Sequence, residues 1–440
     1  CQVRRACEST PSCRQAIAAC PVIMYNPVIR SQDGATEVVD LEARRKAPRV
    51  ALFYAITSLY WFSLYTYVPT LSPYARSIGA SYRMVGMIIG SYGFIQLLLR
   101  IPLGLFSDNT GRRKVFVVLG VLFSLLSAVG LYVSRNPFSL LVSRSLSGVA
   151  ASMWVVFTVL FVGYFDSGDA PKAIGLINSF TSLGQICAML LGGWVAGRFG
   201  ETAPFVVGAC GAAMGLVLSL GATEVRSSGT GRLDLRGFVS VVSDPHLLIV
   251  SLLAVVVQLL TFGTVYGFTP VIAKSIGASD FETGVLATLA ILPTVFVAAM
   301  SGTVFRRVFG ERNTIAGSFI LIAASCFYIP YARQMMPLYV AQIIGGIGRG
   351  TALPLLMGLS IRSVPVERRA TAMGFFQAVY AFGMFIGPVL VGFLSDIVGL
   401  SWGFWAVGLL GVAGALLTLL LVREAARAKA APAALDRMVH

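Results

Sequence analysis

The sequence predicts an all-α membrane protein with twelve transmembrane helices in two related halves. Of its 440 residues, 56% are hydrophobic and 12% are charged, and the mean hydropathy is +0.80. A soluble domain carries roughly 25% charged residues, because its surface has to be hydrated. The apolar residues fall in blocks of roughly 20, the length at which a helix crosses a bilayer. Strict alternation of apolar and polar residues, which a membrane β-barrel requires, is missing, so the blocks are expected to be helices.

Twelve such blocks can be placed along the chain. In order, the expected spans are 50–73, 83–106, 115–134, 137–164, 173–197, 203–222, 247–272, 284–305, 314–332, 337–361, 371–394 and 400–422. The two blocks at 137–164 and 337–361 are longer than a bilayer requires, which predicts tilt or interfacial ends.

Basic residues in the loops predict the orientation. Twenty-two Lys and Arg residues fall on the side that holds both termini, and six fall on the other. Because cytoplasmic loops carry the excess of Lys and Arg, both termini are expected in the cytoplasm of a bacterial inner membrane. The net charge of +15 then reflects contact with anionic lipid headgroups, and no nucleic-acid partner is needed.

An internal repeat relates the two halves of the chain. Residues 75–86 read ARSIGASYRMVG and residues 273–284 read AKSIGASDFETG, with seven identical positions. The same offset of 198 places Gly104 on Gly302 and Gly148 on Gly346, and an offset of 199 places Gly175 on Gly374, Gly193 on Gly392 and Gly200 on Gly399. Such repeats typically form two bundles with a solute site between them near the bilayer midplane.

The expected domain organisation follows from these blocks. Two six-helix bundles are placed at 50–222 and 247–422, joined by a polar cytoplasmic linker at 223–246. Residues 24–49 form a cytoplasmic leader and 423–440 a cytoplasmic tail. Residues 1–23 are interpreted as a non-native or mis-annotated extension, because they hold four cysteines without an apolar core or a zinc-ligand spacing. No metal site and no cofactor are expected.

The loop after the second span carries a motif of small and charged residues, Gly104-Leu-Phe-Ser-Asp108-Asn-Thr-Gly111-Arg112-Arg113-Lys114. It resembles the signature loop of the major facilitator superfamily, in its expected position, and the resemblance covers residues 48 to 425. It implies that Gly104, Asp108, Gly111, Arg112 and Arg113 form a cytoplasmic gate. Gly104 permits a close contact between helices. The Asp108 carboxylate can accept hydrogen bonds from the N-terminus of a neighbouring helix, whose dipole attracts negative charge. Asn109 replaces a residue that is often basic, and Arg306 replaces the acid in the second half.

A second motif lies in the fourth span. Arg144-Ser-Leu-Ser-Gly148-Val-Ala-Ala151 resembles the arginine-glycine-alanine motif of proton-linked exporters in that superfamily. The fifth span departs from the exporter pattern, because Ala188-Met189 replace a glycine-proline pair, which appears instead as Gly387-Pro388 in the eleventh span. A helix–helix hydrogen bond is the alternative role for Arg144.

Charges inside the spans predict the kind of solute. Arg100, Arg144 and Arg349 lie within spans, whereas Asp and Glu lie at helix ends or in loops. Arginine stays charged in a protein and is costly in a membrane unless it is paired or hydrated. We therefore expect Arg144 and Arg349 to bind a neutral or anionic solute, and Arg100, near the cytoplasmic end, to serve the gate.

Polar groups in the spans complete the expected solute site: Tyr60, Gln96, Gln185, Gln258, Tyr266, Gln377 and Tyr380, with Asn178 and Gln342 as further candidates. Interhelical hydrogen bonding is the alternative for each. The aromatic runs at 60–61 and 65–67 could also form a belt at the membrane interface.

The combined pattern favours a transporter over other classes. An enzyme is not expected, because the chain has two histidines and no buried acid pair or phosphate-binding loop. The first expectation is a monomeric alternating-access exporter of a small organic solute, with proton coupling left open. An uptake symporter, an uncoupled facilitator and a non-transporting membrane sensor remain as alternatives.

Overall fold

The structure is a computed structural model that describes residues 48–165, 169–225, 241–362, 364–365 and 368–422. Within these ranges all regular structure is helical, which confirms the all-α prediction. The chain divides into a unit of residues 1–48 and a unit of residues 49–440, and the helices described below belong to the second. The predicted leader and tail, the extension at 1–23 and the centre of the linker lie outside the described residues.

The first bundle begins with a helical segment at 48–65 that continues, after a short turn, into a second helix. Its further elements are α4 (Val68–Ser77), α5 (Tyr82–Thr110), α6 (Arg113–Val133), α7 (Pro137–Ser152), α8 (Trp154–Val162), α9 (Ala170–Phe199) and α10 (Ala203–Leu220).

The second bundle repeats this order with more irregular segments. Its elements are α12 (Pro245–Leu260), the π-helix η2 (Thr261–Phe268), α13 (Thr269–Ser275), α14 (Asp280–Met300), the π-helix η3 (Ser301–Phe305), α15 (Arg306–Phe309), α16 (Glu311–Tyr328), the 3₁₀ turn η4 (Ile329–Tyr331), α17 (Met335–Ser360), α18 (Arg369–Val398) and α19 (Leu400–Leu421). Eleven helical segments in the described ranges are long and apolar enough to cross a membrane. The segment at 48–65 together with α4 occupies the position of the first expected span.

The backbone confirms the internal repeat. Gly79 and Gly277, at equivalent positions, have φ angles of +90° and +91°. After each glycine a serine caps the next helix: the Ser81 side chain accepts from the Met84 N–H, and the Ser279 side chain accepts from the Glu282 N–H. These left-handed turns suit glycine because it has no Cβ. The duplication therefore extends to the local conformation of both copies.

Several expected spans are interrupted rather than continuous, and two of them illustrate this. The block at 137–164 breaks at Met153, whose N–H bonds to the Ala150 carbonyl three residues earlier, at 2.9 Å. The block at 247–272 contains the π-helix η2, where the Thr261 and Thr264 hydroxyls donate to carbonyls four residues earlier at 2.7 and 2.6 Å. Threonine hydroxyls that compete for backbone carbonyls distort helices, a feature that hydrophobic block length does not reveal.

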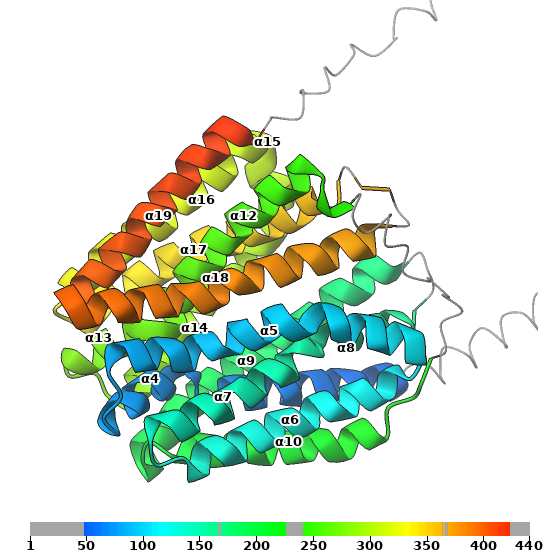
Figure 1. Ribbon diagram of the computed structural model, residues 1–440, viewed down its shortest axis with the longest axis horizontal. Coiled ribbons are helices and arrows are strands. Elements are labelled where there is room, and N and C mark those ends of the chain that lie inside the picture. The colour runs from blue at the N-terminus through cyan, green and yellow to red at the C-terminus, as the bar shows by residue number, and fades with distance from the viewer. Residues whose placement is uncertain (1–47, 166–168, 226–240, 363, 366–367, 423–440) are drawn as a thin grey trace, which may run out of the picture. The chain divides into compact units, whose positions relative to one another are not determined.

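Two helix pairs join the bundles. Helix α5 of the first bundle packs along α18 of the second, and α9 packs along α14 in the equivalent way (Figure 1). We call the end of these helices that holds 75–86 and 273–284 the repeat end, and the end that holds the loop 104–114 the gate-loop end. Residues on α5, α7, α17 and α18 that face this boundary form the candidate site.

Candidate functional site

Arg144 lies inside the first bundle with its charge against aromatic rings. It projects from α7 and is 3% exposed. Its guanidinium carbon lies 4.6 Å from the centre of the Tyr92 ring and 5.6 Å from that of Tyr67, and its Nη1 donates to the Tyr67 hydroxyl at 3.4 Å. A cation over an aromatic face is stabilised by the ring quadrupole, most strongly where water is excluded. The bundle thus holds this charge without a carboxylate among these contacts.

Arg349 is buried on α17 of the second bundle, seven residues beyond Gln342, which is the position equivalent to Arg144 at the offset of 198. Its Nη2 donates to the carbonyl and the Oε1 of Gln342, at 3.3 and 3.4 Å, and to the Ala290 carbonyl on α14, at 3.4 Å. All of these partners are neutral, and the hydrogen bonds are long for a guanidinium. Arg349 therefore keeps capacity to bind an acceptor.

Arg100 connects the two bundles. Although it belongs to α5, its Nη1 donates to the Gln377 carbonyl at 3.3 Å and to the Tyr380 hydroxyl at 3.4 Å, both on α18. Its guanidinium carbon lies 5.7 Å from the centre of the Tyr380 ring. The structure thus brings Arg100, which was expected to serve the gate, together with Gln377 and Tyr380, which were expected in the solute site.

Several buried donors around these arginines have no hydrogen-bond partner in the described part of the chain. They are Nε of Arg100, Nε of Arg144 and Nε2 of Gln342. An unpaired buried donor costs free energy, and such groups are usually satisfied by water or a ligand. The region therefore offers N–H donors to a molecule rich in acceptors.

A chain of aromatic rings lies beside the arginines and crosses between the bundles. Trp61 contacts Trp154 and Tyr65, with ring centres 5.1 and 5.6 Å apart, and Tyr65 contacts Tyr266 at 5.8 Å. Tyr266 contacts Phe262 at 4.9 Å, and Phe262 stacks on Tyr92 at 5.8 Å. Tyr60, Trp61, Tyr65 and Tyr67 are all buried, so they do not form an interfacial belt. The position of this aromatic chain depends on packing between segments about 200 residues apart, so spacing along the sequence did not indicate it.

The remaining predicted lining residues divide between packing and partial exposure. The Tyr60 hydroxyl donates to the Ala150 carbonyl at 2.5 Å, and its ring stacks on Phe157. Gln96 Nε2 donates to the Tyr92 carbonyl of its own helix at 3.3 Å. Gln258 is buried, Gln185 and Gln377 are half-buried, and Asn178 is exposed.

The gate loop has a well-defined backbone. Helix α5 ends at Thr110, and Gly111 follows with a φ angle of +61°. The backbone N–H groups of Arg113 and Lys114 donate to the two carboxylate oxygens of Glu224, at 3.0 and 2.8 Å. Glu224 follows α10, and the sequence analysis missed it. An acid just after the sixth span is the signal that could have revealed it, because a helix N-terminus favours a carboxylate.

The structure describes the surroundings of Gly104 in this loop, but not the side chain of Asp108. The close helix contact expected at Gly104 is absent in this structure: among the described atoms none lies within 4 Å of where its side chain would begin. Asp108 lies near the end of α5, but its side chain is outside the described part, so its predicted role in the gate stays a prediction.

Glycines of the two helix pairs show which end of the boundary is closed. At the repeat end, Gly392 lies against the Tyr82 carbonyl, and Gly193 lies against Gly284, with no room for a side chain. Toward the gate-loop end, by contrast, no described atom lies within 4 Å of a side chain built on four equivalent glycines, Gly104, Gly302, Gly175 and Gly374. The bundles are therefore in backbone contact at the repeat end and separated at the gate-loop end.

Solved structures with a similar fold are transporters. A bacterial homologue of the human lysosomal transporter Spinster, in an inward-facing and occupied conformation, superposes with a TM-score of 0.69, covering 84% of this chain and 95% of that one at 16% identity. The nucleoside transporter NupG superposes with a TM-score of 0.70, covering 86% of this chain and 100% of that one at 13% identity. These likenesses concern the fold.

Sequence comparisons identify the family. The uncharacterized MFS-type transporter MJ1560 of Methanocaldococcus jannaschii is 24% identical over 346 residues, 76% of this chain and 87% of its own. The quinolone resistance protein NorA of Staphylococcus aureus is 25% identical over 165 residues, 38% of this chain and 42% of its own length. The family model for the Major Facilitator Superfamily matches residues 53–271 and 251–437. The chain belongs to the Major Facilitator Superfamily of membrane transporters.

Proposed function

We propose that this protein exports a small neutral or anionic organic solute by alternating access of its two bundles. The observation that carries the proposal is the set of three buried arginines, Arg100, Arg144 and Arg349, whose described partners are aromatic rings, hydroxyls, amides and carbonyls. Among the described residues, no carboxylate contacts any of these buried charges, so a solute that brings acceptor oxygens gains charge-assisted hydrogen bonds there.

The positions of the described carboxylates support a preference for neutral or anionic solutes over cationic ones. Every described carboxylate lies in a loop or in the first or last turn of a helix: Asp169, Glu201, Glu224, Asp244, Asp280, Glu282, Glu311 and Asp396. A cationic solute near the boundary would meet like charge with no carboxylate at its side, and like charges in a low-dielectric site repel strongly.

Export is supported by the charge distribution and by one relative. The excess of Lys and Arg at the gate-loop end supports a cytoplasmic location of that end in a bacterial inner membrane, and the present conformation would then take up solute from inside. NorA, a quinolone resistance protein, matches part of the chain. Uptake is the alternative direction, and protons are the candidate coupling ion.

The proposal is tested with two dyes that share a ring system and differ in charge. Fluorescein is an anion and rhodamine 123 a cation. The uptake of each dye into inside-out vesicles or proteoliposomes is measured by fluorescence. We expect net movement of fluorescein and at least a tenfold lower rate for Arg349→Ala, because one lost charge-assisted hydrogen-bonding group costs about 1.5–3 kcal/mol.

Arg135→Ala serves as the matched control, since Arg135 is exposed in the loop between α6 and α7 and not on α17. Movement of rhodamine 123 in preference to fluorescein, or an unchanged rate in Arg349→Ala, would contradict the proposed charge preference. Repeating the assay with and without an imposed pH gradient shows whether protons are coupled.

A further inference from the structure

Asp396, at the repeat end, makes a contact between the bundles that the proposed function does not use. It lies in the last turn of α18, and its two carboxylate oxygens accept from the backbone N–H groups of Tyr82 and Arg83, both at 2.9 Å. These N–H groups belong to the first turn of α5, in the other bundle. One carboxylate therefore bridges two segments more than 300 residues apart, at the contact where the repeat end is closed.

Helix α5 depends on this bond for its N-terminus. The first N–H groups of a helix have no partner within it, and they attract negative charge. Ser81 accepts from Met84, but α5 has no acid in its first turn. The N–H groups of Tyr82 and Arg83 thus receive their acceptors from α18. The Arg83 guanidinium also lies 4.8 Å from the centre of the Phe393 ring, a second contact across the same boundary.

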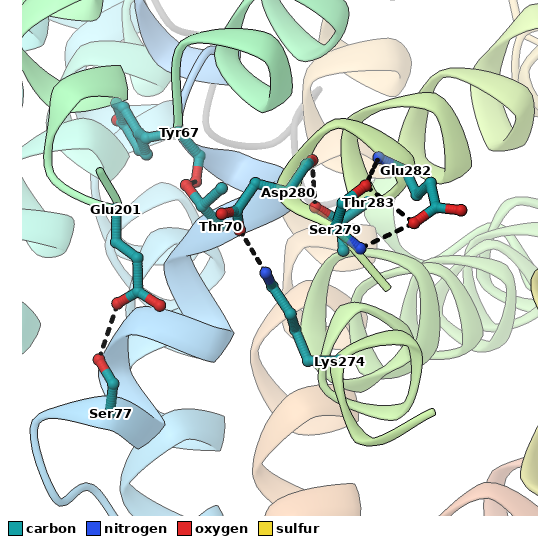
Figure 2. A network of polar contacts seen from close by, with 9 residues as sticks. All are labelled: Tyr67, Thr70, Ser77, Glu201, Lys274, Ser279, Asp280, Glu282 and Thr283. Carbon is teal, nitrogen blue, oxygen red and sulfur yellow. Dashed lines mark hydrogen bonds and ion pairs between the residues drawn. The ribbon is translucent and has the colours of Figure 1, made fainter. Parts of the chain in front are cut away.

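The duplicated partner of this contact lacks such a bridge. Helix α14 caps itself: Ser279 accepts from the Glu282 N–H, the Glu282 side chain accepts from the Ser279 N–H, and Asp280 pairs with Lys274 at 2.6 Å (Figure 2). At the offset of 199, the position of Asp396 corresponds to Gly197, which faces the first turn of α14. The bridging carboxylate is therefore present at only one of the two equivalent contacts.

From this asymmetry we infer that Asp396 is a gating residue that holds the repeat end closed across α5 and α18. When the repeat end opens, α18 moves away from α5 and the bond between the carboxylate and the N–H groups of Tyr82 and Arg83 is lost. The α9–α14 contact has no matching bond to lose, since backbone packing of Gly193 on Gly284 holds it. The inference rests on the alternating access proposed above.

Distances between spin labels test the inference without any solute. Labels at Met87 on α5 and Trp402 on α19 lie on different bundles near the repeat end, on side chains that are 36% and 56% exposed. In a background with serine for each native cysteine, we expect Asp396→Ala to raise the open, longer-distance population about fivefold, the effect of losing one N-terminal cap. Asp396→Asn keeps one acceptor oxygen, so its open population should lie between those of the wild type and Asp396→Ala.

Two controls separate a gate from helix stability. Adding Met84→Glu to Asp396→Ala gives α5 the acid that α14 has at the same position, so α5 is capped again without a bond to α18. Glu201→Gln removes a carboxylate at the same end that accepts from Ser77 within the first bundle, at 2.9 Å (Figure 2).

The expected result is that the double variant stays open and Glu201→Gln matches the wild type. The inference is overturned if Asp396→Ala shows the wild-type distances, or if Met84→Glu returns the double variant to the closed distance, because Asp396 would then only cap a helix. The spin-label distances do not depend on dye movement. A wrong proposal about the solute would therefore leave this test of Asp396 unaffected.

Discussion

At Arg349 the guanidinium fits only because Gly345, one turn earlier on α17, has no side chain. A Cβ on Gly345 would lie 2.7 Å from Nη1 of Arg349 and 2.7 Å from Oγ of Ser325 on α16. This glycine lies in the run Gly345-Gly346-Ile347-Gly348, where close helix packing is the usual role. Here Gly345 also leaves room for the Arg349 guanidinium to lie along α17 and donate to Gln342.

Gly345→Ala is therefore predicted to displace the Arg349 side chain. We expect dye movement to fall as far as in Arg349→Ala, with a loss of about 1–3 kcal/mol of stability from overpacking. Gly317→Ala on α16 is the control, since no described atom lies within 4 Å of its added Cβ. Wild-type movement in Gly345→Ala would show that Arg349 is not held where transport requires it.

At the scale of helices, acids from elsewhere in the chain cap the N-termini that lack their own. Helix α6 starts with Arg113 and Lys114, which carry the wrong charge for a helix N-terminus, and Glu224 supplies the carboxylate from beyond α10. Helix α5 receives Asp396 in the same manner. The basic gate-loop sequence is thus compatible with a helix start because the acid comes from another segment.

The cap on α6 predicts a measurable loss of stability. Glu224→Ala should lower the free energy of unfolding by about 1 kcal/mol, the typical value of an N-terminal cap. Thermal unfolding in detergent measures the shift in Tm. The matched control is Glu201→Ala, whose carboxylate accepts from one exposed hydroxyl and should change stability by less than about 0.5 kcal/mol. Equal Tm values for both variants would contradict the capping role.

For the whole molecule, the register between α5 and α18 predicts what happens when the boundary closes at the other end. Gly86 lies against Pro388, Gly93 against Met384 and Arg100 against Gln377, so the antiparallel register continues to Gly104 opposite Gly374. In this conformation the two glycines have no described atom near them. Closing the gate-loop end brings them together, as Gly193 and Gly284 are at the repeat end.

Cysteines at these two positions should report that closure. In a background without native cysteines, Gly104→Cys with Gly374→Cys is expected to crosslink slowly in the present conformation and to stop dye movement once the crosslink has formed. Each single variant, treated in the same way, controls for the substitutions. If a complete crosslink left movement unaffected, the two bundles would not alternate about this boundary, and the proposed mechanism would be wrong.

The sequence by itself determined the features that depend on local composition. Block hydrophobicity placed the helices, the repeat at offsets of 198 and 199 predicted two equivalent bundles, and the position of Arg144 and Arg349 inside spans identified buried charge. These signals are local, because a helix must satisfy its own backbone and match the bilayer in any tertiary context.

The tertiary structure alone decided the partners of those residues and the end at which the bundles touch. The aromatic rings around Arg144, the carbonyl on α18 that Arg100 reaches, and the N–H groups that Asp396 accepts all come from distant segments. Packing between helices sets such pairs, and the alternating access proposed above requires a second state in which other glycines are in contact. A sequence that is compatible with both states does not specify one of them.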